Sequence, residues 1–141
     1  MFKQRAVLAA LVTVLLAGCG SGSADAPATI RDVNVAEAMA LSDTATILDV
    51  RTAAEFAEGH IDGALNIDVD DASFDANIAK LDRSRSYVVH CTANVPNGRS
   101  ARALETMQQL GFTSLGNMTG GYLAYLEATA PEAGTPSLQD E

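Results

Sequence analysis

Five short apolar runs separated by helical patterns are the feature of this chain that most constrains its fold. Runs of about five residues match the usual length of a β-strand, and helical segments connect them. Strands that alternate with helices favour an α/β fold with a mainly parallel sheet. The predicted strands are residues 29–33, 46–50, 63–67, 86–90 and 113–118.

Sequence patterns typical of helices lie between the predicted strands. Asn34 with Glu37, and Thr52 with Glu55, have the spacing of capping boxes at helix starts, and Gly59 ends the second helix. Ligands of such folds bind outside the carboxyl ends of the strands. Apolar residues at helical spacing predict the later helices: Phe74, Ile78 and Leu81; then Ala103, Met107 and Leu110 up to Gly111; and a last helix after Gly120 and Gly121.

The N-terminal segment has the layout of an export signal. Lys3 and Arg5 precede an apolar run over residues 6–17, which as a helix is too short to cross a bilayer core of about 30 Å. Residues 16–19, Leu-Ala-Gly-Cys, resemble a bacterial lipobox, and this resemblance implies that Cys19 is lipidated. The alternative is an ordinary secretory signal with a chance cysteine.

Lipidation predicts where the protein resides. Two or three acyl chains, palmitate among them, anchor a protein far more durably than one chain does. We therefore expect the protein at the extracytoplasmic face of a cell membrane, either in a periplasm or on the outer surface. The predicted division is a lipoprotein signal peptide over residues 1–18, lipidated Cys19 with a flexible tether over 19–29, a folded domain over 30–128 and a disordered tail over 129–141.

The charge balance excludes several classes of partner. Eighteen acidic and nine basic residues give a formal net charge of −9, and loss of Lys3 and Arg5 leaves eighteen against seven, or −11. Such a surface disfavours nucleic acid and anionic headgroups, so the only membrane contact we expect is the lipid anchor. Small anions are also repelled at long range, so an anion site must act within about one Debye length of 8–10 Å.

The cysteine count is informative. If Cys19 carries lipid, Cys91 has no partner for an intramolecular disulfide. A single thiol in an exported protein is either buried and inert or retained for its reactivity. We predict no metal site and no cofactor, because the chain has no C-x-x-C motif and its two histidines, His60 and His90, lie far apart in sequence.

Cys91 follows a predicted strand and precedes a loop and a predicted helix. A helix N-terminus and a nearby arginine lower the pKa of a thiol and activate it. The amides of residues 92–98 can converge as an anion nest, with Asn97 and Gly98 forming a left-handed turn and Arg99 supplying a planar cation. Such a site suits transfer of a sulfur or phosphorus centre onto the thiol, and a buried structural cysteine is the alternative.

A longer stretch supports a family assignment. Residues 48–68, LDVRTAAEFAEGHIDGALNID, closely resemble the first signature of rhodanese domains, and VVHC, RSARAL, LGF and GGYLAY follow in matching order. The resemblance implies an α/β domain with a central parallel sheet of about five strands and helices on both faces. It also implies that the loop cysteine takes sulfur from a small anionic donor such as thiosulfate, and that a thiol or cyanide acceptor collects it from the persulfide.

The resemblance assigns roles within the loop. Cys91 is the expected nucleophile, and Arg99, the arginine that closes the loop, is the second expected catalytic residue. Pro96 has no N–H to offer to a substrate. The expected substrate-binding amides are those of Thr92, Ala93, Asn94, Val95, Asn97 and Gly98.

The other signature residues are expected to be structural. Arg51 is placed to pair with Glu55 four residues on, and Asp49 to hold loop backbone at the end of the sheet. His60 is expected to pack through a hydrogen bond. His90 is not assigned as the base, because neighbouring side chains of a strand point to opposite faces.

The loop departs from the family pattern in length. Catalytic rhodaneses usually have four residues between cysteine and arginine, and the related phosphatases and arsenate reductases have five, whereas this chain has seven, and NVP at residues 94–96 resembles an insertion. Three functions remain open: a membrane-anchored sulfurtransferase or persulfide carrier, an inactive rhodanese-fold binding module, and a phosphatase-like or arsenate-reducing enzyme. We expect the first, with the extra residues altering which substrate is served, and predict no particular protein partner.

Overall fold

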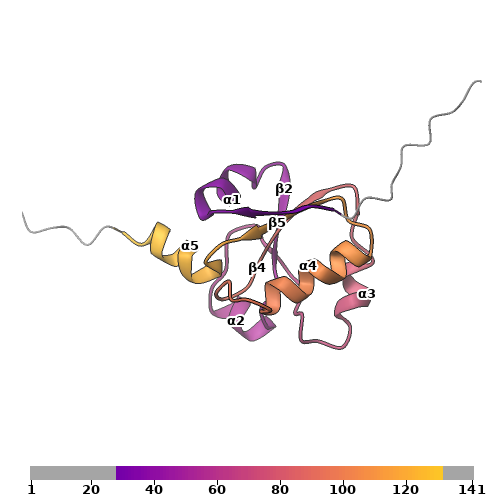
Figure 1. The fold of residues 1–141 in the computed structure, drawn as a ribbon. Coiled ribbons are helices and arrows are strands. Elements are labelled where there is room, and N and C mark those ends of the chain that lie inside the picture. The colour runs from indigo at the N-terminus through magenta and orange to yellow at the C-terminus, as the bar shows by residue number, and fades with distance from the viewer. Residues whose placement is uncertain (1–27, 132–141) are drawn as a thin grey trace, which may run out of the picture.

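A five-stranded sheet forms the centre of residues 28–131, the part of the chain that the computed structural model describes (Figure 1). Every pair of neighbouring strands is parallel, in the order β1-β5-β4-β2-β3. The predicted α/β fold and its parallel sheet are confirmed. The strands are β1 (Ile30–Val33), β2 (Ala45–Asp49), β3 (Leu65–Asn66), β4 (Ser86–His90) and β5 (Ser114–Met118).

Five helices connect and follow the strands. Both predicted capping boxes form: Asn34 and Glu37 exchange hydrogen bonds at the start of the first helix, and Thr52 and Glu55 do so at the second. The helices are α1 (Val35–Leu41), α2 (Ala53–Glu58), α3 (Phe74–Ile78), α4 (Arg99–Gln109) and α5 (Gly121–Thr129).

Helices cover both faces of the sheet, as predicted (Figure 1). On one face Leu48 and Val89 pack with α3 and with Met107 of α4. On the other face Val88 and Met118 pack with α1 and with the tyrosines of α5. The central strands β2 and β4 are therefore buried on both sides, which explains their nearly continuous apolar sequences.

Two elements, the third strand and the third helix, are shorter than predicted by more than one residue. The third strand starts at Leu65 and not at residue 63, because Gly63 has a left-handed φ of 76° and the Ala64 amide closes a turn onto Ile61. The third helix ends at Ile78, and the amide of Leu81 closes a turn onto the Ile78 carbonyl instead of continuing the helix.

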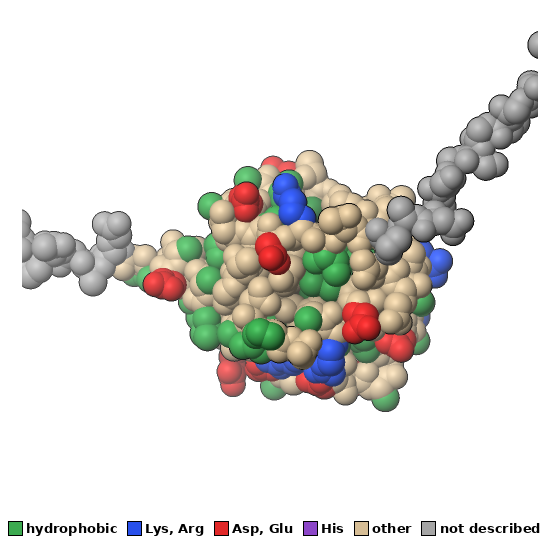
Figure 2. Space-filling model, viewed as in Figure 1, with side chains coloured by type: hydrophobic (Ala, Val, Ile, Leu, Met, Phe, Trp, Pro, Cys, Tyr) green, Lys and Arg blue, Asp and Glu red, His purple; other side chains and the backbone are tan. Residues whose placement is uncertain are grey.

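The predicted signal peptide, the lipidated Cys19, nearly all of the tether and most of the tail lie outside the described residues. Among the helices that the structure describes, none combines the length and apolar character needed to cross a membrane. The face of the domain seen in Figure 2 carries interspersed acidic and basic side chains and no broad basic surface.

Candidate active site

Cys91 lies at the carboxyl edge of the sheet, directly after β4 and facing the start of α4. Cys91 is buried, with 3% of its surface exposed. Its Sγ lies 3.0 Å from the carbonyl oxygen of Ala93 and 3.6 Å from Oγ of Ser100, which is buried in the first turn of α4. The thiol borders a hollow of about 370 Å³ lined by Cys91, Thr92, Ala93, Val95, Asn97, Gly98, Arg99 and Arg102.

The loop after Cys91 contains a β-turn of its own. The amide of Gly98 donates to the carbonyl of Val95 at 3.0 Å, Pro96 is the second residue of the turn, and Asn97 has a φ of 56°. Proline followed by a residue of positive φ is the pattern of a type II turn, which Asn tolerates at the third position. The predicted left-handed turn therefore forms at Asn97, and the Gly98 amide is bonded within the loop instead of pointing at a ligand.

The N-terminus of α4 keeps amides available for an anion. Its N-cap is Gly98, whose extended backbone carries no capping side chain. The first amides of a helix have no partner inside the helix, and the helix dipole adds positive potential there. The predicted amide cradle of Thr92, Ala93, Asn94, Val95 and Asn97 stays a prediction, and of these residues Asn94 does not line the hollow.

Arg99 is held by Glu55 across the site. Its Nη1 and Nη2 donate to the two carboxylate oxygens of Glu55 at 2.6 and 2.8 Å, and Nη2 also donates to Oγ1 of Thr92 at 2.7 Å. Thr92 Oγ1 in turn donates to Glu55 at 2.8 Å. The Arg99 bond holds the pKa of Glu55 far below its usual range and raises the pKa of Arg99. The guanidinium fork is thus engaged by a carboxylate of the same chain.

Arg102 is a second cation on the wall of the hollow, one turn further along α4. Its Nη2 lies 2.6 Å from Oδ1 of Asp70, and the two side chains are 51% and 48% exposed. Sequence reasoning missed this residue, although its i, i+3 spacing from Arg99 places both on one side of a helix.

Arg51 and Asp49 form a buried ion pair, and this pair contradicts one prediction made from the sequence. Arg51 binds Asp49, not Glu55: its Nη2 lies 2.6 Å from Oδ2 of Asp49, and both side chains are almost completely buried. Arg51 precedes the N-cap Thr52, so it lies outside α2 and the helical i, i+4 spacing to Glu55 does not apply.

The same arginine connects the pair to α5. Its guanidinium lies 3.9 Å from the centroid of the Tyr122 ring and donates to the Gly59 carbonyl at 2.8 Å. The Tyr122 amide donates to the carbonyl of Cys91 at 2.8 Å. The chain from Asp49 through Arg51 to Tyr122 therefore ends on the backbone of the candidate nucleophile, and Tyr122 is another residue that sequence reasoning missed.

Both histidines lie away from the thiol. His60 stacks on the ring of Phe56, and its Nδ1 lies 2.9 Å from the Phe56 carbonyl. His90 is completely buried, its Nε2 is 3.7 Å from Oδ2 of Asp49, and burial lowers its pKa. Its ring faces Tyr122 on the sheet face opposite to the one on which Cys91 packs, so the structure gives it no contact to Sγ.

Within residues 28–131, no group of three or more His, Cys, Asp and Glu side chains gathers as metal ligands. Fold and site together define a class of protein: a small α/β domain with one thiol at the carboxyl end of its central strand, followed by a loop and a helix N-terminus. A model of the Rhodanese-like domain matches residues 34–128, which is most of the chain. The chain belongs to the rhodanese-like family.

Relatives include several sulfurtransferases. Over 99 residues the chain is 32% identical to the thiosulfate sulfurtransferase GlpE of Shewanella oneidensis, covering 70% of this chain and 92% of that protein. It is 32% identical over 116 residues to the mitochondrial protein HIGH ARSENIC CONTENT 1 of Arabidopsis thaliana, covering 72% and 67%. The match to the probable adenylyltransferase/sulfurtransferase MoeZ of Mycobacterium tuberculosis is 33% identical and covers 61% of this chain but only 21% of that protein.

Solved structures agree with the family. A rhodanese-related protein from Thermoplasma volcanium is 31% identical with a TM-score of 0.60, covering 72% of this chain and 95% of that one. The human single-domain sulfurtransferase TSTD1 is 30% identical with a TM-score of 0.57, covering 74% and 99%. A single domain of this family therefore accounts for the described part of the chain.

Proposed function

We propose that this protein is an exported, membrane-anchored sulfurtransferase or persulfide carrier that works through Cys91. It takes a sulfane sulfur from thiosulfate or a similar donor and passes it to a thiol or cyanide acceptor. The observation that carries the proposal is the thiol itself: Cys91 borders a hollow that α4 faces with its N-terminus and with two arginines. The relatives named as thiosulfate sulfurtransferases support this reaction class, and the resemblance of residues 16–19 to a lipobox supports the anchor.

The reaction has two balanced steps. In the first, the Cys91 thiolate attacks the outer sulfur of thiosulfate, a sulfur–sulfur bond forms to Sγ, the sulfur–sulfur bond of the donor breaks, and sulfite leaves with its electron pair. In the second, the acceptor thiolate or cyanide attacks the outer persulfide sulfur, and Cys91 leaves as a thiolate. The thiol proton is lost to solvent before the first step, and no external oxidant is needed.

The neighbours of Sγ suggest how the thiolate is held. The thiol donates to the Ala93 carbonyl oxygen at 3.0 Å, and this bond is given up when the thiol loses its proton. Ser100 can rotate its hydroxyl hydrogen toward sulfur, and the uncapped first turn of α4 adds positive potential. Helix N-termini stabilise thiolates for this reason.

Donor capture requires a cation that can release its present partner. Arg99 is engaged by Glu55 through two bonds and by Thr92 through a third. Arg102 has a single exposed pair with Asp70, and exposed pairs of this kind contribute about 1 kcal/mol or less. We assign Arg102 to the incoming anion and Arg99 to holding the loop.

Mass spectrometry tests the reaction. The full chain is incubated with thiosulfate or polysulfide and weighed intact, and the expected result is a gain of one sulfur atom that a thiol or cyanide then removes. Cys91→Ser must abolish the gain. Turnover of an aryl phosphate or of arsenate without sulfur gain would favour the oxyanion enzymes, and no reaction with any donor would leave a binding module.

The anchor has its own test. In the bacterial host, Cys19→Ser is expected to move the protein from the membrane fraction to the soluble extracytoplasmic fraction. Cys91→Ser, the matched control, should remain with the membrane. A soluble wild-type protein would refute the anchor without touching the sulfur chemistry.

A further inference from the structure

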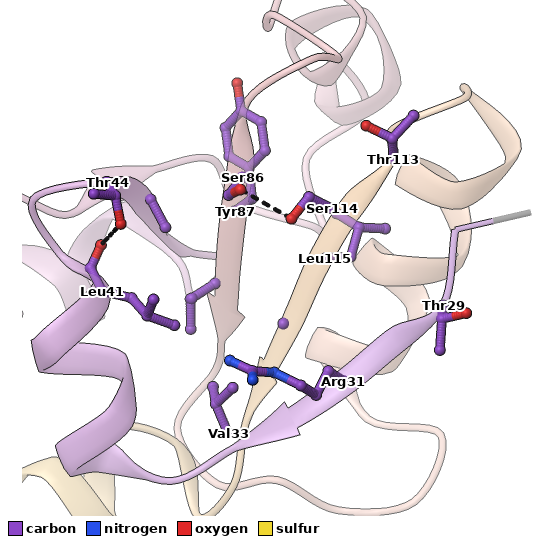
Figure 3. Close-up of a pocket in the computed structure, with 13 residues that line it drawn as sticks. Thr29, Arg31, Val33, Leu41, Thr44, Ser86, Tyr87, Thr113, Ser114 and Leu115 are labelled. Atoms are coloured by element: carbon purple, nitrogen blue, oxygen red, sulfur yellow. Dashed lines mark hydrogen bonds between the residues drawn. The ribbon is translucent and has the colours of Figure 1, made fainter. Parts of the chain in front are cut away.

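A second hollow, of about 380 Å³, lies at the end of the sheet opposite to Cys91 (Figure 3). It sits over β1 and over the amino-terminal halves of the next three strands of the sheet, β5, β4 and β2, on the face that α1 and α5 cover elsewhere. It is lined by Thr29, Arg31, Val33, Leu41, Thr44, Ala45, Ser86, Tyr87, Val88, Thr113, Ser114, Leu115 and Gly116.

The length of α1 explains why this part of the sheet is open. Its seven residues span only about 10 Å, whereas a five-residue strand is about 17 Å long. The strand row of Val33 and Met118 is buried beneath the helices, and the next row toward the amino ends, Arg31, Gly116 and Val88, forms the floor of the hollow.

The floor of the hollow is lowest at Gly116, because glycine has no side chain. Gly116 pairs with Arg31 on one side and Val88 on the other, so a position in the middle of the sheet carries no side chain. A Cβ built at Gly116 would lie 3.4 Å from a methyl group of Val88 and 3.6 Å from one of Val33, which is ordinary contact. The position can therefore accept a side chain, and a larger one would fill the hollow.

Arg31 supplies the charge of this hollow. Its side chain reaches from β1 across the hollow toward Leu41 (Figure 3). Among residues 28–131, no carboxylate forms an ion pair with its guanidinium, and no acidic residue lines the hollow. Ser86 donates to Ser114 at 2.9 Å at the rim, where both hydroxyl oxygens can still accept. In a chain of net charge −9, this is a locally positive and partly apolar site.

We propose that this hollow binds a small organic acid. Its carboxylate pairs with the Arg31 guanidinium, which offers two parallel N–H donors to such a group. Its apolar body lies over Gly116 against Val33, Val88 and Leu41. An inorganic anion would leave the space above Gly116 unfilled, and a nucleic acid or an acidic protein would be repelled by a chain of net charge −9. The site is separate from Cys91 and does not depend on the sulfur chemistry.

Titration of the full chain with hexanoate tests the site, followed by backbone amide resonances. Saturable shifts are expected at Ser86, Ser114 and Gly116. Hexanamide, the neutral isostere, and acetate, which lacks the apolar body, should each bind at least about tenfold more weakly.

Two substitutions test the binding site independently of each other. Arg31→Met should weaken hexanoate binding at least about tenfold, and Gly116→Val should abolish it by filling the floor. Lys80→Met removes an exposed cation outside this hollow and should bind as the wild type does. Thermal unfolding of each variant verifies that it is folded.

The proposal is overturned by unchanged binding in Arg31→Met, by equal binding of hexanamide, or by shifts confined to the loop after Cys91. Equal binding of acetate would also overturn it, because the apolar walls would then contribute nothing.

Discussion

Replacing Glu55 by glutamine removes the negative charge of this side chain and nearly preserves its shape. In the wild type the carboxylate accepts two bonds from Arg99, one from Thr92, and both the amide and the hydroxyl of Thr52. Glutamine keeps one acceptor oxygen and can still serve the helix cap of α2. It removes the negative charge and replaces one acceptor that faces Arg99 by an NH₂ donor.

The expected loss follows from the burial of the pair. The Arg99 and Glu55 side chains are 24% and 32% exposed, which places them between a surface pair worth about 1 kcal/mol or less and a buried pair whose disruption costs about 3–5 kcal/mol. We expect Glu55→Gln to lower the free energy of unfolding by about 1–2 kcal/mol at neutral pH. For a domain of this size that lowers Tm by about 4–8 °C for each kcal/mol.

The loss must depend on pH in one direction. The folded state holds the pKa of Glu55 well below its ordinary value of 4.5, with the Arg99 bond as the largest cause. A carboxylate with a depressed pKa contributes its full stability above its unfolded pKa and loses it as the pH falls toward the folded value. The stability difference between wild type and Glu55→Gln should therefore be constant above about pH 6 and shrink below about pH 4.5.

Urea unfolding followed by circular dichroism, at about pH 7 and about pH 3.5, measures this difference. Glu58→Gln is the matched control, since Glu58 is exposed and lies in the same helix. Asp71 and Asp82 also have lowered pKa values, but they are present in every variant and cancel in the comparison. An unchanged unfolding free energy in Glu55→Gln, or the same difference at both pH values, would refute the assignment of this bond as the anchor of the loop.

Two further pairs of substitutions examine the site. Arg102→Met should raise KM for thiosulfate roughly two- to tenfold with little change in kcat, and Asp70→Asn should lower KM, as steady-state kinetics will reveal; equal KM values in all three proteins would remove Arg102 from donor capture. Gly121→Ala should cost at least about 2 kcal/mol in urea unfolding, because a Cβ there would lie 2.5 Å from the Cys91 carbonyl at a φ of 62°. Gly63→Ala, at a φ of 76° with nothing within 4 Å, should cost only about 1 kcal/mol, so equal losses would show that backbone strain alone decides.

The elements that could be predicted from sequence are those that local chemistry decides. The capping boxes at Asn34 and Thr52 use only residues within one helical turn, and both form. The apolar runs of β2 and β4 are buried on both faces, so their composition was informative without knowledge of the partner strands. The strand order, in contrast, depends on crossovers between residues far apart in sequence.

The candidate site was predictable in position but not in its pairings. The end of β4 and the start of α4 place Cys91 from local signals alone. The partner of Arg99 is Glu55, 44 residues away, and no helical spacing indicates that contact. The prediction that Arg51 pairs with Glu55 was wrong because it treated Arg51 as part of a helix that begins only after Thr52.

The seven residues between Cys91 and Arg99 include a local turn. Val95 to Gly98 form a β-turn, with Pro96 and Asn97 at its two central positions. A turn closed by its own hydrogen bond returns the chain near to where it left. The loop can therefore hold seven residues while Arg99 still begins α4 and still reaches Glu55.

Under the proposed function, this arrangement would explain how an acidic protein captures an anionic donor. Each arginine of the site already has an anionic partner, so neither pair attracts a second anion through net charge. Capture is then an exchange, in which the donor displaces a carboxylate that moves into water. Arg102 can exchange more easily, since one exposed bond holds Asp70 while Arg99 and Glu55 share two bonds in a less exposed position. The two proposed roles therefore follow from the exposure of the two arginines: we propose that the less exposed Arg99 holds the loop and that the more exposed Arg102 meets the substrate.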